Sequence, residues 1–263
     1  MSSWGRSRLV RRGLFITVVV LVCVAVGLPA LAYTSRGTHT YVIRSGNGPQ
    51  FGSSTATCPR GQVVLFGGYS NGVAGMRRTA SNRLTVDGYN LGGQPLWLTS
   101  FAYCGRGPVS TQATGTVKIS SFGTATATCP RGKVVVAGGF AATPHTVIAL
   151  TRLERVAANR LQVSAYLRYG ISKHSSLTAI AFCGAGPAPK LVSQTLNAPK
   201  TGGTVEAACP AGKKLTFGGV IATAPGYHPL VFSMAAIDQQ TWRVRESTDK
   251  RTTATLTSLA YCR

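Results

Sequence analysis

The stretch TATCPRGQVVLFGG at residues 55–68 returns as TATCPRGKVVVAGG at 126–139 and, more loosely, as EAACPAGKKLTFGG at 206–219. A second motif follows each copy at a distance: LTSFAYC at 98–104, LTAIAFC at 177–183 and LTSLAYC at 256–262. Self-similarity of this kind is the signature of a repeat architecture. The chain therefore contains three copies of one unit, which we place at residues 40–108, 112–187 and 190–263.

Each copy has the pattern of six short β-strands separated by turn residues. Proline and glycine after the first cysteine favour a tight reversal, because proline fixes φ and glycine tolerates positive φ. A β-branched run such as Val134-Val135-Val136 follows, and a later strand alternates apolar and polar residues, as in 83–87. Residues 152–161 have a weak helical pattern, but they align with strand positions of the other copies. We expect no helix after residue 32, and a polar lead-in without a strand from Tyr33 to about His39.

Two glycines end the third strand of each copy, at 67–68, 138–139 and 218–219. A glycine within a strand indicates a bend or the close approach of another backbone. A phosphate-binding loop would need a following helix or Lys-Ser/Thr, and neither pattern is present. Because one unit of this size buries little apolar surface alone, we expect the three to pack closely around a shared axis. The predicted fold is all-β, with three tandem antiparallel repeats related by pseudo-threefold symmetry in a single domain, 33–263.

The first 32 residues have the pattern of an export signal. Four arginines precede an apolar run from Gly13 to Leu28, and Ala30-Leu31-Ala32 supplies the small residues that a signal peptidase reads. An uncleaved anchor is the alternative, because residues 13–32 are just long enough to span a bilayer. We therefore expect a secreted or extracellular protein, either cleaved after Ala32 or held to the cell membrane by this segment.

Six cysteines follow residue 32, two in each repeat, and an even number in an exported chain predicts disulfides. Identical units favour identical bridges within each repeat: Cys58–Cys104, Cys129–Cys183 and Cys209–Cys262. Bridges between neighbouring repeats (Cys104–Cys129, Cys183–Cys209 and Cys58–Cys262) are the alternative. Zinc binding is disfavoured, because closely spaced pairs such as C-x-x-C do not occur.

The chain is strongly basic, with a formal net charge of +22. Without the four arginines of the first 32 residues, 24 basic and 6 acidic residues remain, a net charge of +18. Such a charge predicts non-specific attraction to polyanions at low salt. The basic residues are scattered in runs of at most two, so no specific nucleic-acid partner is indicated. A solubilising surface adapted to an anionic cell envelope explains the charge equally well.

The Cys-Pro-x-Gly turn, the strand that ends in Gly-Gly and the closing Ala-[Phe/Tyr]-Cys resemble tandem repeats of exported actinobacterial proteins of unknown function. The plan of three β units, each starting near Cys-Pro-x-Gly, also resembles the vitelline membrane outer layer proteins. That resemblance implies a β-prism of three Greek-key sheets and suggests a carbohydrate-related role. The repeats here are longer, Gly-Gly is not a shared signature, and no functional residue is transferred.

The sequence contains few residues that could take part in catalysis. The six acidic residues after residue 32 form no repeated pair, and the sequence indicates neither an enzyme nor a cofactor or metal. Aromatic rings that stack on sugars and loop imidazoles are the best candidates for ligand contact. Those after each Gly-Gly form the candidate site: Tyr69, Phe140, His145, Tyr227 and His228. Further aromatic candidates for sugar stacking are Trp97, Tyr89 and Tyr166.

These features favour a non-enzymatic exported module that binds an extracellular or cell-envelope polymer, either polysaccharide or anionic wall material. Three loops after the Gly-Gly pairs would give three sub-sites and a gain in avidity. The alternative is a passive structural or protein-partner module of the cell surface. An exposed apolar patch would favour that alternative, whereas a polar groove lined by aromatic residues would favour polymer binding.

Overall fold

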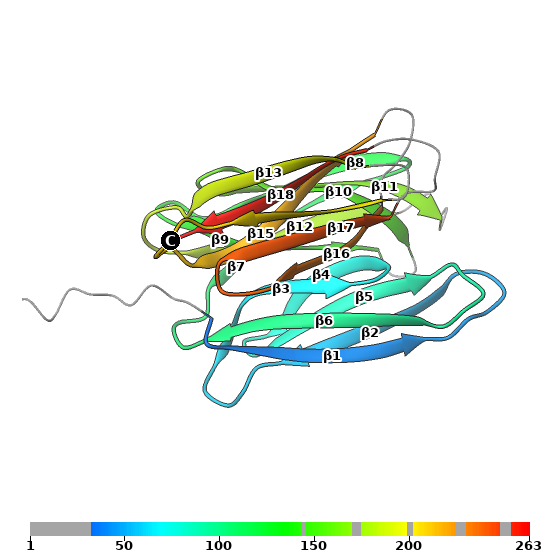
Figure 1. The fold of residues 1–263 in the computed structure, drawn as a ribbon, viewed down its shortest axis with the longest axis horizontal. Coiled ribbons are helices and arrows are strands. Elements are labelled where there is room, and N and C mark those ends of the chain that lie inside the picture. Colours follow the sequence, from blue (N-terminus) through cyan, green and yellow to red (C-terminus); the bar gives the residue numbers. More distant parts are fainter. Residues whose placement is uncertain (1–32, 144–145, 170–174, 199–201, 225–229, 248–253) are drawn as a thin grey trace, which may run out of the picture. The chain divides into compact units, whose positions relative to one another are not determined.

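A computed structural model describes residues 33–143, 146–169, 175–198, 202–224, 230–247 and 254–263. The described residues form eighteen β-strands and no helix, so the all-β prediction is confirmed (Figure 1). Residues 152–161, which have a weak helical pattern, belong to two strands and the turn between them. The expected signal segment lies outside the described residues.

Each repeat supplies six strands. Repeat 1 contains β1 (Ser35–Ile43), β2 (Gln50–Thr57), β3 (Val63–Ser70), β4 (Val73–Ala80), β5 (Arg83–Asn90) and β6 (Leu96–Gly105). Repeat 2 contains β7 (Thr111–Lys118), β8 (Phe122–Thr128), β9 (Val134–Ala142), β10 (Val147–Ala157), β11 (Arg160–Tyr169) and β12 (Ser176–Gly184). Repeat 3 contains β13 (Lys190–Ala198), β14 (Gly203–Ala208), β15 (Leu215–Thr223), β16 (Leu230–Ala236), β17 (Thr241–Ser247) and β18 (Ala254–Cys262).

The first strand begins earlier than the sequence predicts. β1 starts at Ser35 and pairs with β6 over nine residues, so the expected lead-in to His39 is wrong. β1 is an edge strand, and most of its side chains are exposed. Its polar composition therefore gave no apolar alternation from which a strand could be recognised.

Each of the three sheets is shared by two repeats. Sheet A has the order β1-β6-β3-β16-β17-β14, sheet B β2-β5-β4-β9-β12-β7, and sheet C β13-β18-β15-β10-β11-β8. Three strands of one repeat thus continue into three strands of the next, at the pairs β3–β16, β4–β9 and β10–β15 (Figure 1). We call these pairs the repeat junctions. A single cluster of buried apolar residues draws on all three repeats.

Each disulfide connects two different sheets, which the junctions do not do. Cys58–Cys104, Cys129–Cys183 and Cys209–Cys262 are formed, which confirms the pairing within repeats. In repeat 1, Cys58 follows β2 of sheet B, and Cys104 lies on β6 of sheet A. Each bridge thus joins two sheets within one repeat, while each junction joins two repeats within one sheet.

The two glycines of each pair have different neighbours. A side chain at the first glycine would overlap one from the same repeat, as Gly218 would overlap the ring of Trp242. A side chain at the second glycine would lie less than 3 Å from a carbonyl oxygen of the neighbouring repeat: Met234 O for Gly68, Met76 O for Gly139 and Leu153 O for Gly219. The expectation that the glycine pairs permit close packing of the repeats is confirmed.

The aromatic residue before the last cysteine of each repeat contacts the neighbouring repeat. The hydroxyl of Tyr103 accepts a hydrogen bond from the backbone N–H of Ala236 at 2.7 Å, and that of Tyr261 accepts one from Arg155 at 2.9 Å. Phe182 has no hydroxyl, and its ring lies 4.7 Å from the guanidinium carbon of Arg78. The closing Ala-[Phe/Tyr]-Cys motif therefore contributes to association between repeats.

Candidate ligand grooves at the repeat junctions

A β-bulge adjoins every junction. Next to its junction, each of the strands β4, β10 and β16 has a residue that is skipped in the pairing with the neighbouring strand of its own repeat: Ala74, Thr151 and Phe232. Bulges bend a strand and redirect neighbouring side chains, and they are common beside binding sites. The repeated bulge therefore gives each junction an irregular outward surface in an otherwise regular sheet.

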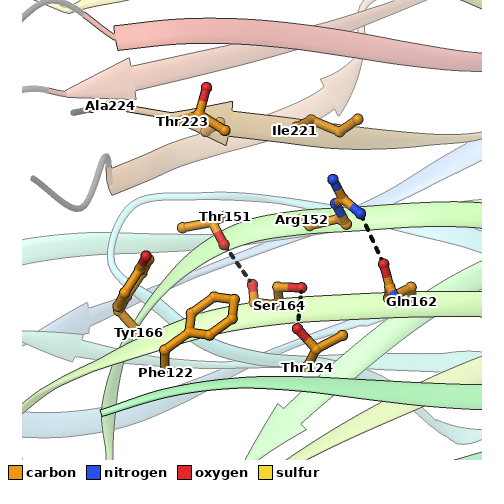
Figure 2. Close-up of a pocket in the computed structure, with 11 residues that line it drawn as sticks. Phe122, Thr124, Thr151, Arg152, Gln162, Ser164, Tyr166, Ile221, Thr223 and Ala224 are labelled. Atoms are coloured by element: carbon orange, nitrogen blue, oxygen red, sulfur yellow. Dashed lines mark hydrogen bonds between the residues drawn. The ribbon is translucent and has the colours of Figure 1, made fainter. Parts of the chain in front are cut away.

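On sheet C, this surface is hollowed into a groove with a cavity of about 320 Å³. Strands β8, β11 and β10 of repeat 2 form one wall, and β15 of repeat 3 forms the other (Figure 2). The lining residues are Phe122, Thr124, Thr151, Arg152, Gln162, Ser164, Tyr166, Ile221, Ala222, Thr223 and Ala224. We call this the sheet C groove. Its volume is at the lower end of the range for small-ligand pockets.

Two aromatic rings lie at one end of the sheet C groove. Phe122 and Tyr166 are directly opposed on β8 and β11, with ring centroids 4.6 Å apart. Phe122 is 46% exposed, although its size favours burial. An exposed phenyl ring beside a half-buried tyrosine offers an apolar face with a polar edge, which is the form of surface that stacks on a sugar ring.

Polar groups line the rest of this groove in a connected arrangement. Arg152 donates from Nη1 to Oε1 of Gln162 at 2.9 Å (Figure 2). Its Nε lies 3.5 Å from the carboxylate of Glu154. The hydroxyls of Thr124 and Ser164 are 2.9 Å apart, and Thr151 donates to the carbonyl of Ser164 at 3.2 Å. The charge of Arg152 is therefore balanced locally, and the groove offers hydroxyl and amide groups rather than a net charge.

Sheet B has a groove of about 470 Å³ at the equivalent junction. Phe51 occupies the position of Phe122, and Asp87 occupies that of Ser164. The carboxylate of Asp87 forms an ion pair with Arg77 and accepts a hydrogen bond from Ser53 at 2.7 Å. Tyr89 is buried here, whereas Tyr166 at the equivalent position on sheet C is only half-buried.

The third junction face, on sheet A, differs in composition. Gly202 stands at the position of Phe51 and Phe122, and Arg243 pairs with Glu206 at 2.7 Å. The three ion pairs formed between described residues thus lie one on each junction face: Arg77–Asp87, Arg152–Glu154 and Arg243–Glu206. Half of the acidic residues that follow the expected signal segment are used in this way. The three junction faces have equivalent strands and an equivalent bulge, but their side chains differ.

The residues predicted from the sequence are distributed differently. Tyr69 and Phe140 are fully buried at the junctions, where they pair with Met234 and Met76, so neither ring is available to a ligand. Burial raises the pKa of Tyr69 well above its usual value, and its hydroxyl donates to the carbonyl of Val231 at 3.3 Å. His145, Tyr227 and His228 lie outside the described residues.

Of the other aromatic candidates, only Tyr166 lines the sheet C groove, while Trp97 is 60% exposed on β6 and Tyr89 is buried. Sequence reasoning missed Phe122. Its signal is its position immediately before Gly123, equivalent to Phe51 before Gly52 in repeat 1. Comparing the starts of the second strands, rather than the loops after Gly-Gly, would have found it.

No known family model matches the chain, and no curated protein sequence is significantly similar to it. Within the described part, histidine, cysteine, aspartate and glutamate do not gather in a group of three that could hold a metal. Within that same part there is also no helix long and apolar enough to cross a membrane. The function must therefore be argued from the geometry of the grooves.

One carboxyl group is buried away from the grooves. Glu246 on β17 is 6% exposed, and neither of its carboxylate oxygens has a hydrogen-bond partner among the described residues. Loss of hydration raises its pKa from 4.5 to about 7. The folded state therefore favours the protonated form, and this contribution to stability is complete below pH 4.5 and is lost as the pH rises through 7.

We expect Glu246→Gln to stabilise the protein at pH 8 by up to about 3 kcal/mol and to have little effect at pH 4.5. Glutamine removes the buried charge at neutral pH while keeping the size of the side chain. Urea unfolding of both proteins from pH 4.5 to 8 measures the difference. Glu206→Gln is the control, because it changes an exposed carboxyl that is paired with Arg243 and should give no gain in stability at pH 8. A gain that does not vary with pH would contradict this explanation.

Proposed function

We propose that the protein is a non-enzymatic exported module that binds a polysaccharide of the extracellular space or cell envelope, with the sheet C groove as its main site. The observation that supports this most is the contact between the exposed ring of Phe122 and the half-buried ring of Tyr166, at one end of a groove lined by hydroxyl and amide groups. Aromatic stacking combined with a few oriented polar groups is how a protein surface recognises a sugar ring. The disulfides are compatible with an extracellular location.

A neutral polysaccharide fits the sheet C groove better than anionic wall material does. Arg152 is the charged residue among the groove's lining residues, and Glu154 and Gln162 already engage it. The net positive charge belongs to the chain as a whole and predicts attraction to any polyanion. Binding that depends on the groove should therefore persist at physiological salt, whereas attraction through the overall charge should weaken.

Phe122→Ala and Tyr166→Ala should each weaken polysaccharide binding about ten-fold, because each removes one face of the stacking surface. Affinity electrophoresis and calorimetric titration at physiological salt, on a panel of neutral and anionic polysaccharides, provide the measurement. Trp97→Ala is the matched control, since Trp97 is an exposed aromatic residue outside the groove. Binding that occurs only at low salt, equally on every polyanion, would reject the proposal.

A protein-partner or structural role is the second candidate, and one surface favours it. Val42 and Trp97 are directly opposed on β1 and β6, and both are exposed. Exposed apolar groups of this kind are typical of contact surfaces. This role predicts that Trp97→Ala, and not Phe122→Ala, changes association with a second protein or a second copy. Pull-down and sedimentation of both variants would discriminate the two functions.

A further inference from the structure

The outward face of sheet C carries a continuous row of side chains beyond the groove. Six residues, one from each strand, are directly paired across the sheet and therefore point to the same side. They are Thr195, Thr257, Ile221, Arg152, Ser164 and Thr124. We call them the sheet C row. Strands lie about 4.8 Å apart, so the row extends for roughly 24 Å perpendicular to the strands.

The groove contains only the last four residues of this row. The first two, Thr195 and Thr257, form a hydroxyl pair 3.0 Å apart at the edge of the sheet, where Thr195 is exposed. One bond between two hydroxyls leaves each with further capacity to donate or accept. The row therefore begins and ends with hydroxyl groups, and Ile221 and Arg152 lie between them.

The Thr195–Thr257 pair has counterparts on the other sheets. Thr40 and Thr99 are 3.1 Å apart on sheet A, and Thr116 and Thr178 are 2.9 Å apart on sheet B. Cross-strand threonine pairs stabilise sheets, so the pair alone does not indicate a ligand. On sheet C, however, the pair is aligned through Ile221 with a groove that contains the exposed ring of Phe122.

We propose that the ligand is an internal segment of an extended, neutral, polyhydroxylated polymer that lies across the strands of sheet C along this row. This inference rests on the proposed function and specifies which part of a polysaccharide is recognised. One sugar ring stacks on Phe122 and Tyr166, the chain crosses the junction over Ile221, and later hydroxyls hydrogen-bond to Thr257 and Thr195. A site for a chain end would need only the groove.

The test compares affinity with ligand length. Cello-, laminari-, malto- and xylo-oligosaccharides from disaccharide to octasaccharide are titrated into the wild-type protein and into the double variant Thr195→Val/Thr257→Val. Valine keeps the shape of threonine and removes the hydroxyl. The double variant Thr40→Val/Thr99→Val on sheet A is the matched control, because it removes the equivalent pair from a face with glycine at the position of Phe122.

In at least one series, we expect the affinity of the wild-type protein to rise with length until the ligand spans the row. The sheet C double variant should lose several-fold affinity for the longest ligands and little for the shortest, and the sheet A variant should behave as wild type. Affinity that is independent of ligand length, or an equal loss of affinity in both double variants, would contradict binding of a polymer along the sheet C row. Neither result would contradict binding of a sugar in the sheet C groove. If neither oligosaccharide nor parent polysaccharide binds the wild-type protein, the proposed function fails as well.

Discussion

Replacing Gly139 by alanine is expected to destabilise the protein by about 3 kcal/mol or more. The added methyl group would lie against the carbonyl oxygen of Met76, which belongs to the backbone of the neighbouring repeat and cannot move away as a flexible side chain can. Overpacking against fixed groups generally costs about 1–3 kcal/mol, and here the junction pairing of β4 with β9 is strained as well. Chemical unfolding in urea measures the change.

Gly93→Ala is the matched control for this substitution. Gly93 lies in a turn, has no neighbouring atom within 4 Å of the position of a Cβ, and does not have a positive φ. We expect its replacement to leave stability nearly unchanged or slightly increased. Gly68→Ala and Gly219→Ala should resemble Gly139→Ala, because their methyl groups would meet Met234 and Leu153 in the same manner. Equal stability of the Gly139 and Gly93 variants would show that the junction does not require glycine.

Removing one disulfide should have the second large effect. The double variant Cys129→Ala/Cys183→Ala opens a bridge between residues 54 positions apart, which corresponds to roughly 4 kcal/mol of denatured-state entropy in the simple model. Both cysteines are buried, so alanine is preferred to serine, whose hydroxyl would need a partner. The loss is measured as a lower urea midpoint.

Reduction of the wild-type protein provides the control for the cysteine substitutions. A reductant should lower the stability of the wild-type protein more than that of the double variant, because three bridges remain to be broken in one and two in the other. Because each bridge joins two sheets within a repeat, and each sheet is shared by two repeats, we expect its loss to lower the stability of all three repeats rather than of one alone. An unfolding midpoint of the double variant that equals that of the wild-type protein would contradict this role.

Much of the architecture could be predicted from the repeats. The two motifs that recur in each repeat indicate the repeats, their strands and their disulfides, because units of the same sequence adopt the same strands and form the same bridges. The strand pattern also gives the faces: Ser100 and Ala102 are buried, whereas Trp97 on the other face is exposed. The sequence does not show that each sheet is shared by two repeats. Alternation shows which side of a strand is buried, but not which repeat supplies the neighbouring strand.

The candidate site was less predictable, and the reason lies in the glycine pairs. The sequence predicts ligand contacts in the loops after Gly-Gly, which makes Tyr69 and Phe140 candidates. Because the second glycine faces the neighbouring repeat, the junction forms there and buries both rings. The bulge that shapes the grooves depends on pairing between strands and has no signature in composition. Phe122 is a candidate because it lines the groove beside this junction, and that groove is formed by strands from two repeats.

The strand pairs that cross between the three repeats should make them unfold as one cooperative body. Differential scanning calorimetry of the oxidised protein tests this most directly, by comparing the calorimetric enthalpy of unfolding with the van 't Hoff enthalpy. We predict a single transition in which the two enthalpies agree. Two or three separable transitions, each with the enthalpy of one repeat, would show instead that the repeats unfold independently.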